Sequence, residues 1–425
     1  STPTAGTSNV RFGVNAGNSI ASGGNYNTVV GDEAGTSITT GDNNVAVGFG
    51  AGDSATTAAQ NVLVGSLAGD AGTTFYNNVA IGYLALSADT LGSNTVAIGK
   101  SALAVQNFTS STDAFNVAIG SSAGASVTTG TLNTLLGGLT GDALTTGNNN
   151  TALGMASLGN DTQGSKSTAV GVAALFQQNF TSATDSYNTA VGYNAGHAVT
   201  TGYNNTLIGG LSGDALTTGD ELTALGYDAG SAVTTGLGNT YIGSRAGTYN
   251  VGATTGNYNT IVGSYSHPST AAGAYQIVLG HNVTGNANSS LCFGTAATDS
   301  AIAFGATSIT APSDVRLKED IQDETIGLDF INALRPVTFL WKKEKDIPEN
   351  LTAHKAGSEV RAMNGKHNHG FIAQEVKATI DSYDLKDGFD MWQEDERDGR
   401  QRVAPSALVP ILVKAIQELT ARITT

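Results

Sequence analysis

Charge, proline and cysteine are scarce in this sequence. Charged residues make up 13% of its 425 residues, about half of the share that is usual in soluble proteins. The single cysteine, Cys292, excludes a disulfide framework within the chain. No apolar run approaches the ~20 residues that a membrane-spanning helix needs, so we expect no membrane insertion. The net charge of −15 argues against a nucleic-acid partner, because phosphate binding requires clustered Lys and Arg.

Glycine, by contrast, is abundant, and the charges are unevenly distributed. The chain has 55 Gly, which often accompanies disorder, but 40% of its residues are hydrophobic, and this suffices for a thin, repeated core. Residues 1–312 carry only four basic residues, whereas residues 313–425 carry sixteen basic residues and both Trp. We therefore place a domain boundary between Pro312 and Ser313.

The first part of the chain is an internal repeat. The phrase Asn-[Thr/Val]-x-[Val/Ile/Leu]-Gly-x-x-Ala-[Gly/Leu] reads NTVVGDEAG at Asn27, NVAVGFGAG at Asn44 and NVLVGSLAG at Asn61. Its glycines recur every 17 residues, except for two steps of 21 that contain the inserts QNFTSSTDAFN at Gln106 and QNFTSATDSYN at Gln178. This period is too short for a helical hairpin and suits coils of short strands that stack on one another.

The repeat predicts a mostly β fold. We expect a β-solenoid shaft over residues 1–285, with about 14 stacked coils, and an irregular β transition segment over residues 286–312. The Val, Ile and Leu just before each repeat Gly, and the Ala three residues after it, are expected to point inward. The repeat Gly are expected to take left-handed backbone or to let neighbouring coils approach. The leading Asn of each phrase is expected to form a ladder between coils.

The phrase NxVAIGxxA resembles the head repeat of trimeric autotransporter adhesins and the shafts of bacteriophage tail fibres. This resemblance covers most of residues 10–285 and implies a homotrimeric shaft. GKS at Gly99 lacks the upstream Gly of a phosphate loop, because Asn94 stands there. The recurring TTG, as at Thr128, is typical of a structural corner more than of a binding face. We expect no cofactor, no metal and no enzyme activity in the shaft.

Residues 313–425 are predicted to form an α/β domain. Leu328, Ile331 and Leu334 share one face of a helix that Pro336 ends, and the strand VTFLW follows. The segment HGFIAQEVKATI predicts a strand that leads into a helix. The closing helix has the pattern of a short coiled coil, which by its residue types alone favours two strands over three. Its seam positions are Val409, Leu412, Ile416, Leu419 and Ile423.

Four sequence blocks of this second part are useful for comparison with known families, and they follow one another in this order: SDVRLKEDI, LDFINALRPVTFLWKK, HGFIAQEV and SALVPILVKAIQELTARI. They resemble the C-terminal intramolecular chaperone of phage tail fibres and tailspikes, the peptidase S74 family. In that family the domain trimerises, guides the folding of the β-rich fibre before it, and then cleaves itself off. The resemblance implies cleavage between Pro312 and Ser313, with Ser313 as the nucleophile and Lys318 as the base.

The residue types suit such a Ser–Lys dyad. A Ser hydroxyl attacks a carbonyl only when a base removes its proton, and a Lys is that base only when it is neutral, which requires burial or a nearby positive charge. Arg316 is close enough in the sequence to supply this charge, and a folded trimer would supply burial. Asp314 and Asp320 are further candidate modulators. Asp320 replaces the Asn of many relatives and is expected to favour protonated Lys318 and to slow the reaction.

Two histidines in KHNHG form a further candidate pair. His367 and His369 could ligate a metal, but no additional ligand cluster stands out, and a structural role is favoured.

We therefore expect a virion structural protein, made in the host cytoplasm. It would be a homotrimeric tail-fibre shaft with a single-turnover serine autoprotease at its C-terminal side and a bacterial surface glycan or protein as receptor. The alternatives are a bacterial trimeric surface adhesin and a fibre-borne glycan-binding or glycan-degrading protein. The first should carry a membrane-anchor segment and the second a recognisable acid pair, and neither stands out here.

Overall fold

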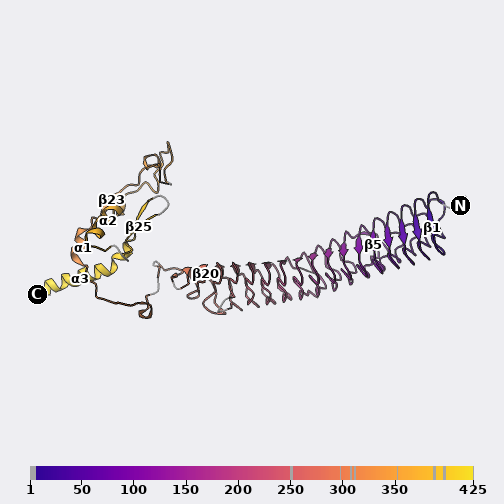
Figure 1. Cartoon of the computed structure of the whole chain (residues 1–425), viewed down its shortest axis with the longest axis horizontal. Helices are drawn as coiled ribbons and strands as arrows, with labels where there is room; N and C mark the ends of the chain where they lie inside the picture. Colours follow the sequence, from indigo (N-terminus) through magenta and orange to yellow (C-terminus); the bar gives the residue numbers. More distant parts are fainter. Residues whose placement is uncertain are drawn as a thin grey trace. The chain divides into compact units, whose positions relative to one another are not determined.

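The computed structural model describes residues 6–248, 252–296, 298–306, 309–310, 313–351, 353–385, 389–395 and 399–424. The chain divides into two compact units, Ser1–Pro312 and Ser313–Thr425. In Figure 1 the first unit is a regular stack of turns, and the second is a smaller group of short helices and strands.

The first unit is a parallel β-solenoid of 17 turns over residues 10–295. Each turn contributes one strand to the main sheet, where it pairs in parallel with the strands of neighbouring turns. Beside the two inserts, β6 (Gly92–Ser93) pairs with β8 (Thr112–Asp113) and β12 (Gly164–Ser165) pairs with β14 (Thr184–Asp185). The strands of the main sheet are β1 (Val10–Phe12), β2 (Thr28–Val30), β3 (Val45–Val47), β4 (Val62–Val64), β5 (Val79–Ile81), β7 (Val96–Ile98), β9 (Val117–Ile119), β10 (Thr134–Leu136), β11 (Thr151–Leu153), β13 (Thr168–Val170), β15 (Thr189–Val191), β16 (Thr206–Ile208), β17 (Thr223–Leu225), β18 (Thr240–Ile242), β19 (Thr260–Val262), β20 (Gln276–His281), β21 (Ser290–Thr295) and the antiparallel β22 (Ser300–Ala303).

The stack is longer than the repeat predicted. Seventeen turns exceed the expected number of about 14, because β1, β20 and β21 pair in the same way although their sequences depart from the phrase. The parallel pairing continues to Thr295, beyond the expected end of the shaft at residue 285. Backbone hydrogen bonds between turns therefore tolerate more sequence variation than the motif suggests.

The solenoid core is built from the middle residue of each short strand. In β2, Val29 is fully buried, while Thr28 and Val30 are only partly buried. The apolar residue directly before the repeat Gly thus faces outward, and Leu136 at this position is 39% exposed. The prediction that these residues point inward is wrong, because side chains alternate along a strand and only the centre of three can face the interior. The other expected inward position is confirmed, since residues such as Ala34 are buried.

The repeat glycines combine unusual backbone with close contact. Gly31 has a φ of +131°, and a Cβ atom there would lie 2.6 Å from the carbonyl oxygen of Gly48 in the next turn. Gly48 meets Gly65 in the same way. Both expected reasons for glycine therefore hold, since a side chain would be strained and would also collide with the neighbouring turn.

Two ladders of polar side chains join successive turns. The backbone N–H and the side-chain amide of Asn44 both donate to Asn27 Oδ1 at 3.0 Å, which confirms the predicted Asn ladder. At another corner the hydroxyl of Thr128, in a TTG corner, donates to the carbonyl oxygen of Thr145 at 3.2 Å, and Thr56 and Thr200 bond alike at the same place in their turns. These hydroxyls stabilise the stack itself, in agreement with a structural role for the TTG corner.

In each 21-residue step, the insert is anchored by a buried carboxylate. Asp161 accepts a hydrogen bond from the side-chain amide of Gln178 at 2.6 Å and from two backbone N–H groups at 3.0 and 3.1 Å. In the other insert, Gln106 donates to Asp89 at 2.6 Å. Burial raises the pKa of Asp89, although its hydrogen bonds act in the opposite direction. The sequence revealed the inserts as a duplicated unit but did not reveal that these acids hold them.

The second unit is the α/β domain that the sequence predicts. Its described elements are α1 (Leu328–Ala333), α2 (Ala373–Ser382), α3 (Val409–Thr424), the antiparallel pairs β23 (Val337–Phe339) with β24 (Asn368–Gly370) and β25 (Trp392–Glu394) with β26 (Gln401–Val403), and the 3-10 turns η1 (Val315–Leu317), η2 (Glu344–Asp346) and η3 (Pro405–Leu408). No helix in the described residues is both long and apolar enough to cross a membrane.

The core of the second unit forms around Phe330 in α1. Phe330 is fully buried and Leu334 nearly so, whereas Leu328 and Ile331 are only partly buried. The predicted apolar face therefore missed its main residue, because α1 has only six residues and its packing, not helical periodicity, selects the buried side. The core side chains are Phe330, Leu334, Val376, Ile380, Met391, Leu408 and Ile411.

Candidate functional site

The two residues of the predicted dyad meet at the start of the second unit. The turn η1 begins after Asp314, whose carboxylate accepts a hydrogen bond from the Arg316 backbone N–H, and ends at Lys318. This tight turn brings Lys318 back to Ser313, so that Lys318 Nζ donates a hydrogen bond to Ser313 Oγ over 2.8 Å. Pro312, on the other side of the predicted scissile bond, lies outside the described residues.

Arg316 is paired with Asp314. Arg316 Nε lies 3.0 Å from Oδ1 and 3.1 Å from Oδ2 of the Asp314 carboxylate. Hydrogen bonding to the Arg316 side chain lowers the pKa of Asp314, and the same bond raises the pKa of Arg316. Asp314 therefore offsets much of the positive charge that Arg316 was expected to contribute beside the base.

Asp320 has a different partner from the one expected. Its carboxylate accepts a hydrogen bond from Gln322 Nε2 at 2.9 Å, and its backbone has a φ of +51°. Within the described part of the chain, no hydrogen bond or ion pair joins Asp320 to Lys318. Any influence of Asp320 on the protonation of Lys318 must therefore act through space and not through contact.

The dyad of the single chain is open to water. Ser313 and Lys318 are exposed, and the neighbouring apolar side chains of Val315, Leu317 and Ile321 are 67%, 65% and 65% exposed. Large apolar side chains grouped around such a site indicate a surface that another surface covers.

The helix α3 presents two faces with different surroundings. On the inner face Ile411 and Ala415 are buried, and Glu418 accepts a hydrogen bond at 2.9 Å from the backbone N–H of Leu328, where α1 begins. The outer face carries the predicted coiled-coil positions, and every one of them is exposed. We call this group the α3 seam: Val409, Leu412, Ile416, Leu419 and Ile423.

The remaining candidates do not assemble into a site. His369 lies in β24, directly beyond the Asn that separates it from His367, and both side chains are exposed. Over the described ranges, no three His, Cys, Asp or Glu side chains are grouped as metal ligands. Cys292 is buried in β21, where desolvation raises the pKa of its thiol.

Comparison with known families finds a match for part of the second unit. Residues 313–385 match the family described as chaperone of endosialidase, Peptidase S74. The match begins at Ser313 and includes η1, the dyad, α1 and α2, whereas α3 lies beyond it. Neither the comparison with curated proteins nor that with solved structures finds a match. A β-solenoid followed by a region of this family fits a fibre-like protein with a C-terminal chaperone.

Proposed function

We propose that this chain is the shaft of a homotrimeric fibre whose C-terminal domain aligns the copies during folding and then cleaves itself off between Pro312 and Ser313. One observation carries the proposal: the 2.8 Å hydrogen bond between Lys318 Nζ and Ser313 Oγ stands at the first residue of the family-matched region.

The proposed reaction needs only groups within the same few residues. Neutral Lys318 accepts the hydroxyl proton of Ser313, and Ser313 Oγ attacks the carbonyl carbon of Pro312. The bond from that carbon to the Ser313 nitrogen breaks, the nitrogen receives a proton from the Lys318 ammonium, and an ester links the two residues. Water then hydrolyses the ester and leaves a free carboxylate and a free Ser313. Because both reacting groups belong to one chain, no association entropy opposes the attack.

Assembly would switch this reaction on. In the single chain the dyad is exposed, and a hydrated Lys is a poor base. Burial of Val315, Leu317 and Ile321 against another copy would remove water from Lys318 and favour its neutral form. The α3 seam offers a place for the copies to meet. Cleavage would then occur only in correctly assembled molecules.

The shaft offers a second surface for association. The outward positions of its strands carry β-branched and aliphatic residues along the sheet, among them Ile208 at 38% and Leu225 at 44% exposed. A long row of such side chains is unusual on the surface of a monomer. Parallel copies would cover this row turn by turn, which supports three aligned shafts as suggested by the resemblance to trimeric adhesin heads.

The test compares purified wild type with Ser313→Ala, Lys318→Gln and the matched control Ser406→Ala, which alters an exposed Ser elsewhere in the same unit. We expect the wild type and the control to yield a fragment that begins at Ser313, as measured by intact mass, while both dyad variants stay whole. Native mass spectrometry gives the copy number. Persistent cleavage in Ser313→Ala, or whole wild-type chains after folding, would count against the reaction.

The proposed biological setting is a virion appendage that is made in the host cytoplasm and contacts a receptor on a bacterial surface. A bacterial trimeric surface adhesin shares the shaft resemblance, but the family-matched region after the shaft favours the fibre. Assembly of the chain into purified virions, detected by immunogold labelling with antibody against the shaft, separates the two.

A further inference from the structure

One stretch of the shaft departs from its own repeat. The second residue after each repeat Gly projects from the same corner of every turn and has positive φ. It is small or aliphatic in most turns, and it is polar or charged at Asn15, Glu33 and Asn194. Four successive later turns carry Asp228, Arg245, Tyr265 and Asn282 at this position, which is the longest polar run. Earlier occupants include Leu67, Leu84, Ser101, Ser122, Leu139, Ala156, Ala173 and Leu211.

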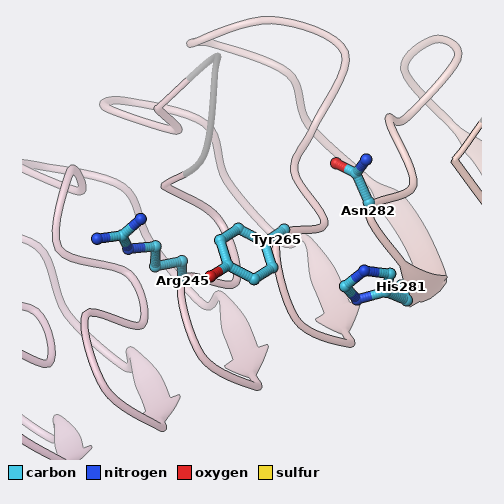
Figure 2. Close-up of a pocket in the computed structure, with 4 residues that line it drawn as sticks. All are labelled: Arg245, Tyr265, His281 and Asn282. Atoms are coloured by element: carbon cyan, nitrogen blue, oxygen red, sulfur yellow. The ribbon is translucent and has the colours of Figure 1, made fainter.

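Arg245, Tyr265 and Asn282, together with His281, line a pocket of about 390 Å³. Figure 2 shows Arg245, Tyr265 and His281 following one another along the turns, with Asn282 beside His281. The volume lies at the lower end of the range of small-ligand sites. No aliphatic side chain is present among these four lining residues, so the pocket offers hydrogen bonds and ring surfaces and no hole for an apolar group.

Contacts between the side chains hold the pocket in shape. Arg245 Nε lies 3.3 Å from Asp228 Oδ2, and the guanidinium carbon lies 5.8 Å from the centre of the Tyr265 ring. The Tyr265 ring meets His281 edge to face, with 5.9 Å between ring centres. In the described residues, the ion pair with Asp228 uses Nε and no hydrogen bond is formed by the Nη atoms of Arg245. The four N–H groups on the two Nη atoms therefore remain for a ligand.

We propose that Arg245, Tyr265, His281 and Asn282 bind a saccharide that carries a carboxylate. A guanidinium pairs with a carboxylate through two parallel hydrogen bonds. The Tyr265 and His281 rings offer flat apolar surfaces for the C–H groups of a sugar ring, and the Asn282 amide both donates to and accepts from hydroxyl groups.

Local charge favours an anionic ligand of low charge density near Arg245 only in so far as the Arg245 charge exceeds that of its Asp228 partner. Arg245 is one of four basic residues in the first 312, so it marks a positive point on an acidic shaft. The neighbouring Asp228 carboxylate already offsets part of that charge. An anion at this place is attracted by Arg245 and repelled by Asp228, each in proportion to its own charge, so a phosphorylated sugar is included in the test as the competing ligand.

The proposed saccharide site rests on the proposed function as a receptor-binding fibre and adds the chemical class of the receptor. Binding is tested separately from cleavage. The purified full chain is titrated with oligosaccharides that contain hexuronic or nonulosonic acids, with their neutral counterparts, and with glucose 6-phosphate, and binding is measured by saturation-transfer NMR. Intact mass is recorded on the same samples, so that failure of cleavage and failure of binding are seen independently.

We expect at least one carboxylated saccharide to bind about tenfold more tightly than its neutral counterpart. Arg245→Leu should weaken that binding about tenfold, and Tyr265→Leu should weaken it as well. Both variants should fold, because Leu67 and Leu84 occupy the same corner in other turns. Lys100→Gln, which removes a different exposed shaft cation, should bind as wild type does.

Three results would overturn the assignment. The first is equal binding of carboxylated and neutral saccharides, or binding of neither. The second is unchanged binding in Arg245→Leu with a wild-type melting curve. The third is tighter binding of glucose 6-phosphate than of every carboxylated saccharide, which would assign the pocket to phosphorylated ligands.

Discussion

The substitution Ile416→Glu in the α3 seam tests whether assembly and cleavage are coupled. The exposed fractions of the five seam residues are 58%, 41%, 62%, 43% and 83% in chain order. Their sum corresponds to about three fully exposed side chains, so covering them is worth about 4–9 kcal/mol per helix. Ile416 contributes about 1–2 kcal/mol of this, and a carboxylate in its place adds a desolvation cost of several kcal/mol in each copy.

We therefore expect Ile416→Glu to dissociate the assembly at micromolar concentration and to abolish cleavage, although Ile416 lies more than a hundred residues from Ser313 in the sequence. Native mass spectrometry measures the copy number, and a denaturing gel time course measures cleavage. Gln417→Glu is the matched control, because it adds the same charge to an exposed neighbouring position outside the seam. If Ile416→Glu assembles and cleaves as the control does, the seam does not organise the copies and the reasoning fails.

Three further predictions concern the buried acids and the dyad. Asp161→Asn should lower the melting temperature because its amide would face the Gln178 amide, at a cost of about 2–3 kcal/mol, and Gln178→Glu in the same chain should restore most of it. Burial raises the pKa of Asp89 above 3.8, so the stability that its protonated form contributes is complete below pH 3.8 and declines as the pH rises through the raised pKa. Asp89→Asn should therefore flatten the pH dependence of the melting temperature by about 2–4 °C, and an unchanged slope would contradict this. Asp314→Asn leaves the positive charge of Arg316 without its carboxylate partner next to the dyad. Cleavage should therefore quicken about threefold to tenfold at pH 7, and a slower reaction in the same time course would refute this.

Much of the shaft could be predicted because its repeat makes each turn a copy of the last. The Asn ladder and the need for Gly31 and its equivalents follow from stacking identical phrases, and both are confirmed. The prediction that Val30 and its equivalents point into the core was wrong. The repeat phrase shows which residues are apolar, but it does not show where a three-residue strand starts. The additional turns were not predicted, because the backbone pairing between turns continues where the sequence no longer matches the repeat phrase.

The candidate dyad could be predicted from the sequence because one short turn joins Ser313 and Lys318. The ion pair beside the dyad could not be predicted from the sequence. Arg316 and Asp314 are two residues apart, and only the shape of η1 brings their side chains together. Phe330 was missed for a related reason, because a helix of a turn and a half has no periodicity from which to read its buried face.

The sequence by itself determined that a stacked, glycine-dependent β-shaft is followed by a charged α/β unit, since the 17-residue period and the change in composition are properties of chain order alone. Only the tertiary structure decided which groups from different turns become neighbours: the buried acids with their glutamines, and Arg245 with Tyr265 and His281. The physical reason is that stacking converts a separation of one period along the chain into a distance of one strand spacing, about 5 Å. Side chains can meet across that distance, and no local pattern encodes the meeting.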